Sequence, residues 1–211
     1  MAVPEGRLPR VVLAVGNAAV PHAAAVLRAV VDPPVSTVCR TTLAGDFQAL
    51  SAAAHQLGLK RSLRRVGLLE QEADEEDAVC VIDRPKHPLV PRAQEEMARV
   101  GERMLEDLDA ALQVLLFGWA DAVVVTQLAM PALRAAGFHY ADIGRLLGEW
   151  LRLEGRVRLR RVPERPLVRV VGGTPAPIVL ATPGAKPSPE ELFLSLKESL
   201  QVAATLVNAK A

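Results

Sequence analysis

Apolar residues along the chain fall into short unbroken runs that alternate with longer stretches of helical spacing. Residues 122–125, an Ala followed by three Val, are the densest run rich in β-branched residues, and the chain becomes polar at Thr126 and Gln127. Unbroken apolar runs are typical of strands covered on both faces, as in a parallel sheet between helices. The same pattern predicts further strands at residues 10–16, 35–39, 66–69, 78–83 and 177–182.

The stretches between these runs have the three-four spacing of amphipathic helices. The clearest extends from residue 92 to residue 117, with apolar positions from Met97 to Leu115 on one side and charges such as Arg103 on the other. Other helices are predicted at residues 21–31, 46–57, 130–136, 141–153 and 190–208. Strands alternating with helices predict an α/β fold, a layered and mostly parallel sheet with helices on both faces and right-handed crossovers.

The last part of the chain has a different pattern. Residues 156–162 alternate Arg with aliphatic side chains, which is the period of a strand with one solvated face. Residues 166–171 are its predicted partner strand. We therefore divide the chain into an α/β core, 1–136, and a basic C-terminal α+β part, 137–211, which is either a subdomain or an extension of the same sheet.

Composition and charge remove several classes of function. Lys and Arg number 25 against 24 Asp and Glu, and aromatic residues are only 3%, so neither a global field nor base-stacking platforms favour nucleic acid. The two cysteines form no disulfide framework, and the four histidines lack the spacing of a metal site. Without a signal peptide or a membrane-length apolar run, we expect a soluble cytoplasmic protein with no membrane partner.

Polar residues gather where the predicted strands end. In parallel sheets the carboxyl ends of the strands meet at one edge, where ligands usually bind. The predicted ligand-binding residues at this edge are Gly16, Asn17, Arg40, Thr41, Thr42, Thr126 and Gln127. We expect them to bind a small anionic metabolite, with turnover as an extension of that role; no cofactor is indicated.

Each of these candidates also has a purely structural interpretation. Gly16 and Asn17 fit an anion site at a helix start or a tight turn, and a single glycine does not make a dinucleotide or phosphate-loop motif. Cys39 is either a nucleophile or a small buried side chain, with Arg40 as the anion clamp. Asp83 is either an acid-base group or a cap of the proline-rich loop after it. Thr126 and Gln127 can equally satisfy backbone groups.

The main alternative is nucleic-acid binding. Residues 137–148 resemble the first helix of a helix-turn-helix. The segment after it would then be the recognition helix or a wing, with predicted phosphate contacts at Arg156, Arg158, Arg160 and Arg161. Alternating Arg and aliphatic residues fit a solvated strand better than a recognition helix. A third hypothesis is a structural subunit of an assembly, and we expect a homo-oligomer.

One short stretch resembles a known family. Residues 120–133 are similar to a strand segment of aspartate/glutamate racemase-like proteins at Asp121, Ala122, Gln127 and Met130. That family needs a cysteine directly after a strand in each of two halves. Cys39 lacks the expected Asn-Thr after it and Cys80 lies inside a predicted strand, so we do not assign the chain to this family.

Overall fold

The fold is built on an eight-stranded sheet with strand order β3-β4-β2-β1-β5-β8-β7-β6. The computed structural model describes residues 7–16, 20–68, 78–83, 93–126, 128–152, 157–172, 174, 176–184 and 187–209. The strands are β1 (Arg10–Ala14), β2 (Arg40–Ala44), β3 (Ser62–Val66), β4 (Ala78–Ile82), β5 (Ala122–Val125), β6 (Arg158–Val162), β7 (Arg165–Gly172) and β8 (Ile178–Ala181). The helices are α1 (Val20–Val31), α2 (Pro33–Ser36), α3 (Phe47–Leu57), α4 (Ala93–Leu116), α5 (Met130–Ala135), α6 (Ile143–Trp150) and α7 (Pro189–Asn208).

The strands from β3 through β8 in this order are all parallel, which confirms the predicted α/β sheet. The strands expected near Val11, Ala78 and Ala122 form where the pattern placed them. Two predicted strands were misplaced. Residues 35–39 do not form a strand, and β3 ends at Val66, where the predicted strand began.

The misplaced second strand has a clear physical cause in Pro33 and Pro34. Proline suits the first turn of a helix because its φ is preset and it lacks only an N–H that would stay unpaired there. The segment therefore forms the short helix α2 after Asp32, and Val35 and Cys39 are buried core residues. Strand β2 starts one residue later, at Arg40, paired with Arg10 of β1.

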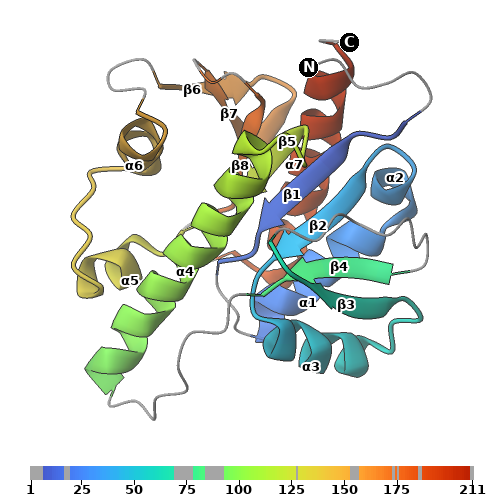
Figure 1. Cartoon of the computed structure of the whole chain (residues 1–211), viewed down its shortest axis with the longest axis horizontal. Coiled ribbons are helices and arrows are strands. Elements are labelled where there is room, and N and C mark those ends of the chain that lie inside the picture. The colour runs from blue at the N-terminus through green and yellow to red at the C-terminus, as the bar shows by residue number, and fades with distance from the viewer. Residues whose placement is uncertain are drawn as a thin grey trace.

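Two apolar layers cover the sheet (Figure 1). Helices α1, α3 and α7 pack on one face against side chains such as Val11, Leu13 and Val124. Helices α4, α5 and α6 pack on the other face against Val12 and Val123. Alternate residues of each central strand thus enter opposite cores, which explains why these strands lack polar alternation.

The C-terminal strands extend the same sheet. Strand β8 lies parallel to β5, β7 is antiparallel to β8, and β6 is antiparallel to β7 at the edge of the sheet. Helix α7 begins at a capping box formed by Ser188 and Glu191 and packs against α1 and β8. The division of the chain at residue 136 stays a prediction.

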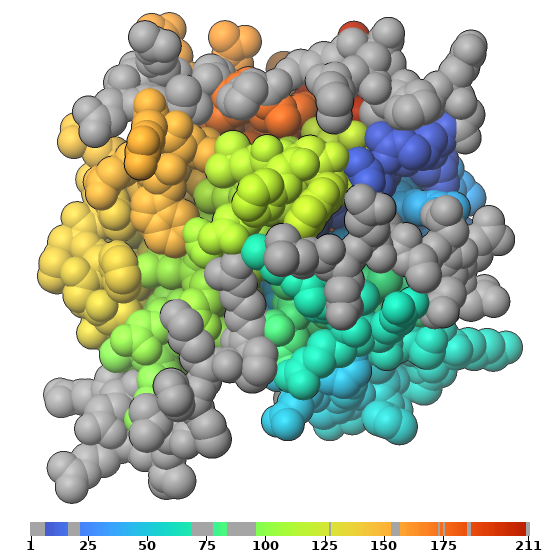
Figure 2. Space-filling view, in the orientation of Figure 1, coloured from blue at the N-terminus to red at the C-terminus, as the bar shows by residue number. Residues whose placement is uncertain are grey.

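One glycine sets the position of α5. A Cβ atom on Gly101 of α4 would overlap the carbonyl group of Ala132 in α5, so only glycine permits this close approach of the two helices. Figure 2 shows α4 across the middle of this face, with α6 and β6 on one side and α3 on the other. No described helix has the length and apolarity needed to cross a membrane.

Candidate functional site

The carboxyl ends of β1 and β5 meet where the direction of the sheet's winding reverses. From β1 the chain passes to β2 on one side, and after β4 it returns over α4 to β5 on the other side of β1. Such a switch point opens a crevice beyond the strand ends, which is where open α/β sheets bind ligands. Thr126 directly follows β5, and Gly16 follows β1 after Val15.

Gly16 and Thr126, both predicted at strand ends, lie against each other. The Thr126 hydroxyl donates a hydrogen bond to the Val15 carbonyl oxygen at 2.7 Å, and its side chain is fully buried. Gly16 has a φ of +69°, and a Cβ atom there would lie 3.1 Å from the Thr126 hydroxyl oxygen. Glycine is therefore required for both backbone conformation and space. Asn17 and Gln127 lie outside the described residues.

His22 is a member of this edge that the sequence analysis did not select. Its Nε2 lies 3.0 Å from the Val15 carbonyl oxygen, so Nε2 carries the proton and donates it. Burial lowers the pKa of His22, against the opposing effect of this hydrogen bond, and keeps the imidazole neutral. Its position in the first turn of the helix after Gly16 was the signal in the sequence.

A buried network of charges connects the ends of β4 and β1. Asp83, directly after β4, pairs with Arg65 of β3 and with Arg103 of α4, whose guanidinium nitrogen lies 2.8 Å from Asp83 Oδ1. Arg103 Nε also donates to Asp107 Oδ1 at 3.0 Å. The Asp107 carboxyl group in turn accepts the backbone N–H of Gly16. Helix α4 thus holds the turn after β1 against the end of β4.

The two carboxyl groups of this network have pKa values shifted in opposite directions. Burial raises the pKa of Asp107 to about 8, although Arg103 and the Gly16 N–H act against it. Burial also acts to raise the pKa of Asp83, but hydrogen bonds and charges from Arg103 and Arg65 outweigh it and the pKa is lowered. Asp83 is therefore a carboxylate balanced by two arginines, an arrangement that fits an ion pair better than a proton acceptor.

The sequence analysis missed the roles of Arg103 and Asp107. It assigned Arg103 to the solvent-facing side of a predicted helix, yet the Arg103 side chain is only 19% exposed and Asp107 is 4% exposed. Helical spacing shows which residues share a face but not what the face contacts. An aspartate between apolar Leu105 and Leu108 was the available signal.

Arg40, Thr41 and Thr42 do not join this edge, which corrects the predicted arrangement. They begin β2, where Arg40 pairs with Arg10 and Thr42 with Val12. Since a strand rises about 3.3 Å per residue, Arg40 lies roughly 13 Å before the carboxyl end of β2. The expected position after a strand followed from the misplaced strand at residues 35–39.

Cys39 lies with Arg40 at the amino edge and is not set up as a nucleophile. The thiol is 2% exposed and lies 3.7 Å from the Val35 carbonyl oxygen and from the Thr41 hydroxyl. Burial raises its pKa to about 11, although the Thr41 contact acts in the opposite direction. A protonated, enclosed thiol lacks the thiolate character that reactivity needs. This environment favours the structural interpretation of Cys39, and its catalytic role stays a prediction.

A pocket of about 240 Å³ lies beyond the ends of β5 and β8. Its wall includes Thr126, Leu128 and Thr182 from the strand ends and Asp142 before α6. Thr182 Oγ1 is buried and has no hydrogen-bond partner among the described residues. A buried hydroxyl without a partner is unfavourable, so a ligand that bonds to it would satisfy this group.

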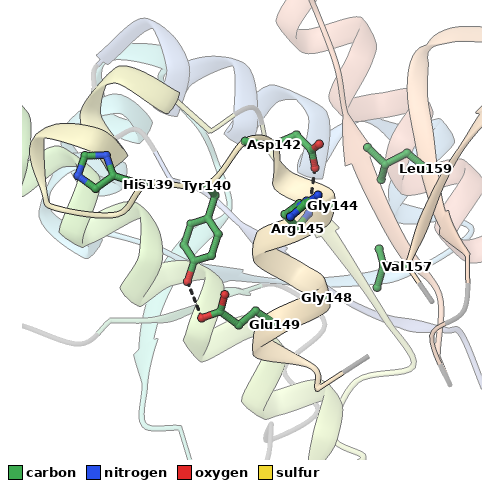
Figure 3. A pocket seen from close by; sticks show the side chains of 10 residues that line it. His139, Tyr140, Asp142, Gly144, Arg145, Gly148, Glu149, Val157 and Leu159 are labelled. Carbon is green, nitrogen blue, oxygen red and sulfur yellow. Dashed lines mark hydrogen bonds between the residues drawn. The ribbon is translucent and has the colours of Figure 1, made fainter. Parts of the chain in front are cut away.

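A second pocket, of about 940 Å³, lies between α6 and the edge strand β6 (Figure 3). One side holds Tyr140, whose hydroxyl donates to Glu149 Oε1 at 3.2 Å, and the other holds Val157 and Leu159. Gly144 and Gly148 of α6 lie between these two sides. The two pockets share only Ala141 and Asp142 among their described lining residues.

The arginines of the nucleic-acid hypothesis lie on a strand rather than a helix. Arg158, Arg160 and Arg161 belong to the exposed edge strand β6, and Arg156 lies outside the described residues. The segment is paired with β7, so the recognition-helix interpretation is wrong, and the wing interpretation stays a prediction. Alternation of Arg and aliphatic residues had indicated such a strand.

In the described ranges, no three His, Cys, Asp or Glu side chains gather to hold a metal ion.

Comparison with known proteins identifies a fold. No protein-family model matches the chain, and no curated protein matches its sequence. A 4-hydroxythreonine-4-phosphate dehydrogenase from Burkholderia phymatum is 23% identical with a TM-score of 0.63, over 79% of this chain and 49% of that one. This chain thus spans about half the length of that structure.

Two further structures match over almost their whole length. A putative 4-hydroxythreonine-4-phosphate dehydrogenase from Salmonella typhimurium is 11% identical with a TM-score of 0.72, over 95% of this chain and 99% of that one. The 4-hydroxythreonine-4-phosphate dehydrogenase from Klebsiella pneumoniae is 12% identical with a TM-score of 0.73, over 97% and 99%. The chain shares their α/β fold. At these identities the likeness concerns architecture and not chemistry.

Proposed function

We propose that this protein binds a small phosphorylated metabolite at the carboxyl edge of its parallel strands. The observation that carries the proposal is the pocket of about 240 Å³ beside the switch point, with the partnerless hydroxyl of Thr182 in its wall. The fold neighbours support a phosphorylated ligand because their names specify a phosphate-bearing substrate.

In this proposal the phosphoryl group lies at the amino end of α1, beside the pocket. Helix α1 starts shortly after Gly16 and has no acidic residue in its first turn, so its amino end can accept an anion. Strands β1, β5 and β8 are consecutive neighbours. At roughly 4.8 Å per strand, the distance from Gly16 to Thr182 suits a metabolite of a few carbon atoms.

Binding is better supported than turnover. In the described lining of the pocket the only titratable side chain is Asp142, and its Oδ1 already accepts the Arg145 backbone N–H at 2.9 Å. The homo-oligomer, the structural-subunit alternative and the cytoplasmic location stay predictions.

Paired ligands test the proposal. We would measure melting temperatures with glycerol 3-phosphate against glycerol, 3-phosphoglycerate against glycerate, and O-phosphothreonine against threonine. A phosphorylated member should raise the melting temperature by mass action on the folded state, and its parent should not. If no phosphorylated compound in the panel stabilises the protein, the proposal is wrong.

Two valine substitutions locate the ligand. Thr182→Val should leave the ligand-free melting temperature unchanged or slightly higher, because it removes a buried hydroxyl without a partner. It should weaken the ligand about tenfold, the effect of a lost hydrogen bond to a charged group. Thr205→Val, on the exposed side of α7, is the matched control and should change neither quantity. Equal affinity in wild type and Thr182→Val would place the ligand elsewhere.

A further inference from the structure

The pocket between α6 and β6 has charged residues along the helix and apolar residues at the strand. Asp142 precedes the helix, Arg145 lies in its first turn, and Glu149 lies one turn further on. Opposite them, β6 and the residue before it contribute Leu159, which is 42% exposed, and Val157. Figure 3 shows Leu159 and Val157 on one side of α6, with Tyr140 and Glu149 on the other.

Arg145 is available for a ligand. Its backbone N–H bonds to Asp142, while its guanidinium makes no hydrogen bond or ion pair with a described residue. Glu149, one turn further on, forms no ion pair with Arg145; one of its oxygens accepts the Tyr140 hydroxyl. Burial and the hydrogen bond to Glu149 both raise the pKa of Tyr140, so the phenol keeps its proton and remains a donor.

The described charges of this pocket disfavour a simple anion as its occupant. Two carboxylates, one guanidinium and the imidazole of His139 are among the described lining residues, and both carboxylates keep lone pairs that can accept further hydrogen bonds. A phosphate would meet both Asp142 and Glu149, whose charges repel it. The pocket at the strand ends shares Asp142 but not Glu149 among its described lining residues.

We infer that the pocket between α6 and β6 binds a basic α-amino acid of the lysine or ornithine type. The α-ammonium group pairs with Asp142, the α-carboxylate with Arg145, and the terminal ammonium with Glu149. This arrangement opposes each charge of the ligand with one charge of the pocket. The inference does not rest on the proposed function.

The dimensions of the helix agree with this assignment. Arg145 and Glu149 are four residues apart, or about 6 Å along the helix axis. The four-carbon stem of lysine reaches a similar distance when extended. Gly144 lies against Leu159, whose Cγ would be 3.6 Å from a Cβ atom at that position, so Leu159 and Val157 form an apolar wall of the pocket that methylene groups of a ligand can contact.

Lysine analogues that each lack one group test the assignment. Titration calorimetry of the full chain should show saturable binding of L-lysine. Norleucine lacks the terminal ammonium, 6-aminohexanoate lacks the α-ammonium and cadaverine lacks the carboxylate. Each should bind about five- to tenfold more weakly, because one charge-assisted contact at a partly exposed site is lost. No saturable lysine binding, or norleucine binding as tightly as lysine, would overturn the inference.

Conservative substitutions test which residues of the pocket bind lysine. Arg145→Gln and Glu149→Gln should each weaken lysine about five- to tenfold, and both positions are exposed, so the fold should be retained. Arg134→Gln, in the last turn of α5 outside the pocket, is the matched control and should bind like wild type. Thr182→Val should also leave lysine binding unchanged. Wild-type affinity in Arg145→Gln or in Glu149→Gln contradicts the assignment.

Discussion

At both edges of the sheet around β1 an aspartate lies between two arginines. At the amino edge both arginines pair with that one aspartate, whereas at the carboxyl edge one arginine also pairs with a second aspartate. At the amino edge, Asp121 accepts Arg7 at 2.9 Å and the Arg10 backbone N–H at 2.7 Å; the Asp121 side chain is 14% exposed and that of Arg7 is 30% exposed. At the carboxyl edge, Asp83 is 5% exposed and shares Arg103 with the more deeply buried Asp107.

The amino-edge pairs hold two segments of the chain together, whereas the carboxyl-edge network also positions the turn beside the proposed site. The amino-edge pairs join the start of β1 to the segment between α4 and β5, and Arg10 also donates to the Gly118 carbonyl oxygen at 2.9 Å. The carboxyl-edge network reaches the Gly16 N–H, at the turn beside the proposed ligand. Shared buried charges shift pKa values, and such shifts concentrate at functional sites. Three predictions test the contrast.

The largest expected effect is the loss of Arg103. Arg103→Met removes the buried partner of the Asp83 carboxylate and a hydrogen-bond donor to the Asp107 carboxyl group, and removing one partner of a buried pair costs about 3 kcal/mol. Arg7→Met, at the more exposed amino edge, should cost at most about 1 kcal/mol. Urea denaturation of both variants measures the two losses. Equal losses would show that the two edges are energetically alike.

The second effect is a pH dependence at the carboxyl edge. The pKa of Asp107 is about 8 in the folded protein, above its ordinary value. At pH values between the ordinary pKa and about 8, the folded state therefore binds a proton that the unfolded state has released. This contribution to stability is present at low pH and is lost as pH rises toward 8, by at most about 1.4 kcal/mol per pH unit.

Asp107→Asn isolates this effect. Between pH 6.5 and 8 the unfolding free energy of the variant should fall less steeply than that of wild type, because the titrating group is gone. The lowered pKa of His22 acts in the opposite direction near its ordinary value, equally in both proteins. Asp121→Asn, at the amino edge, serves as the control. Parallel pH profiles for wild type and Asp107→Asn would contradict a shifted Asp107.

The smallest expected effect concerns Arg40. Because Arg40 starts β2 at the amino edge, Arg40→Lys should leave the melting-temperature shift produced by a phosphorylated ligand unchanged. The same ligand titration, with Thr182→Val as the sensitive comparison, provides the measurement. A lost shift in Arg40→Lys would restore Arg40 as an anion clamp.

The sequence alone determined the architecture and part of the site. Unbroken runs such as residues 122–125 and the spacing from Met97 to Leu115 are local patterns that report burial on both faces or on one, so they predicted parallel strands between helices. Because parallel strands end at one edge, the approach of Gly16 to Thr126 followed from the same reasoning. Thr182, which follows β8, was not chosen because the sequence does not show that its hydroxyl lacks a hydrogen-bond partner among the described residues.

Tertiary structure decided which end of each strand a residue occupies and which charges meet. A shift of the second strand from residues 35–39 to Arg40–Ala44 moved Arg40 from one edge of the sheet to the other. The depth of Arg103 and Asp107 depends on how α4 crosses the strand ends, and no local pattern encodes that crossing. Spacing along the chain specifies which side of a helix is apolar, whereas only packing specifies what its polar side contacts.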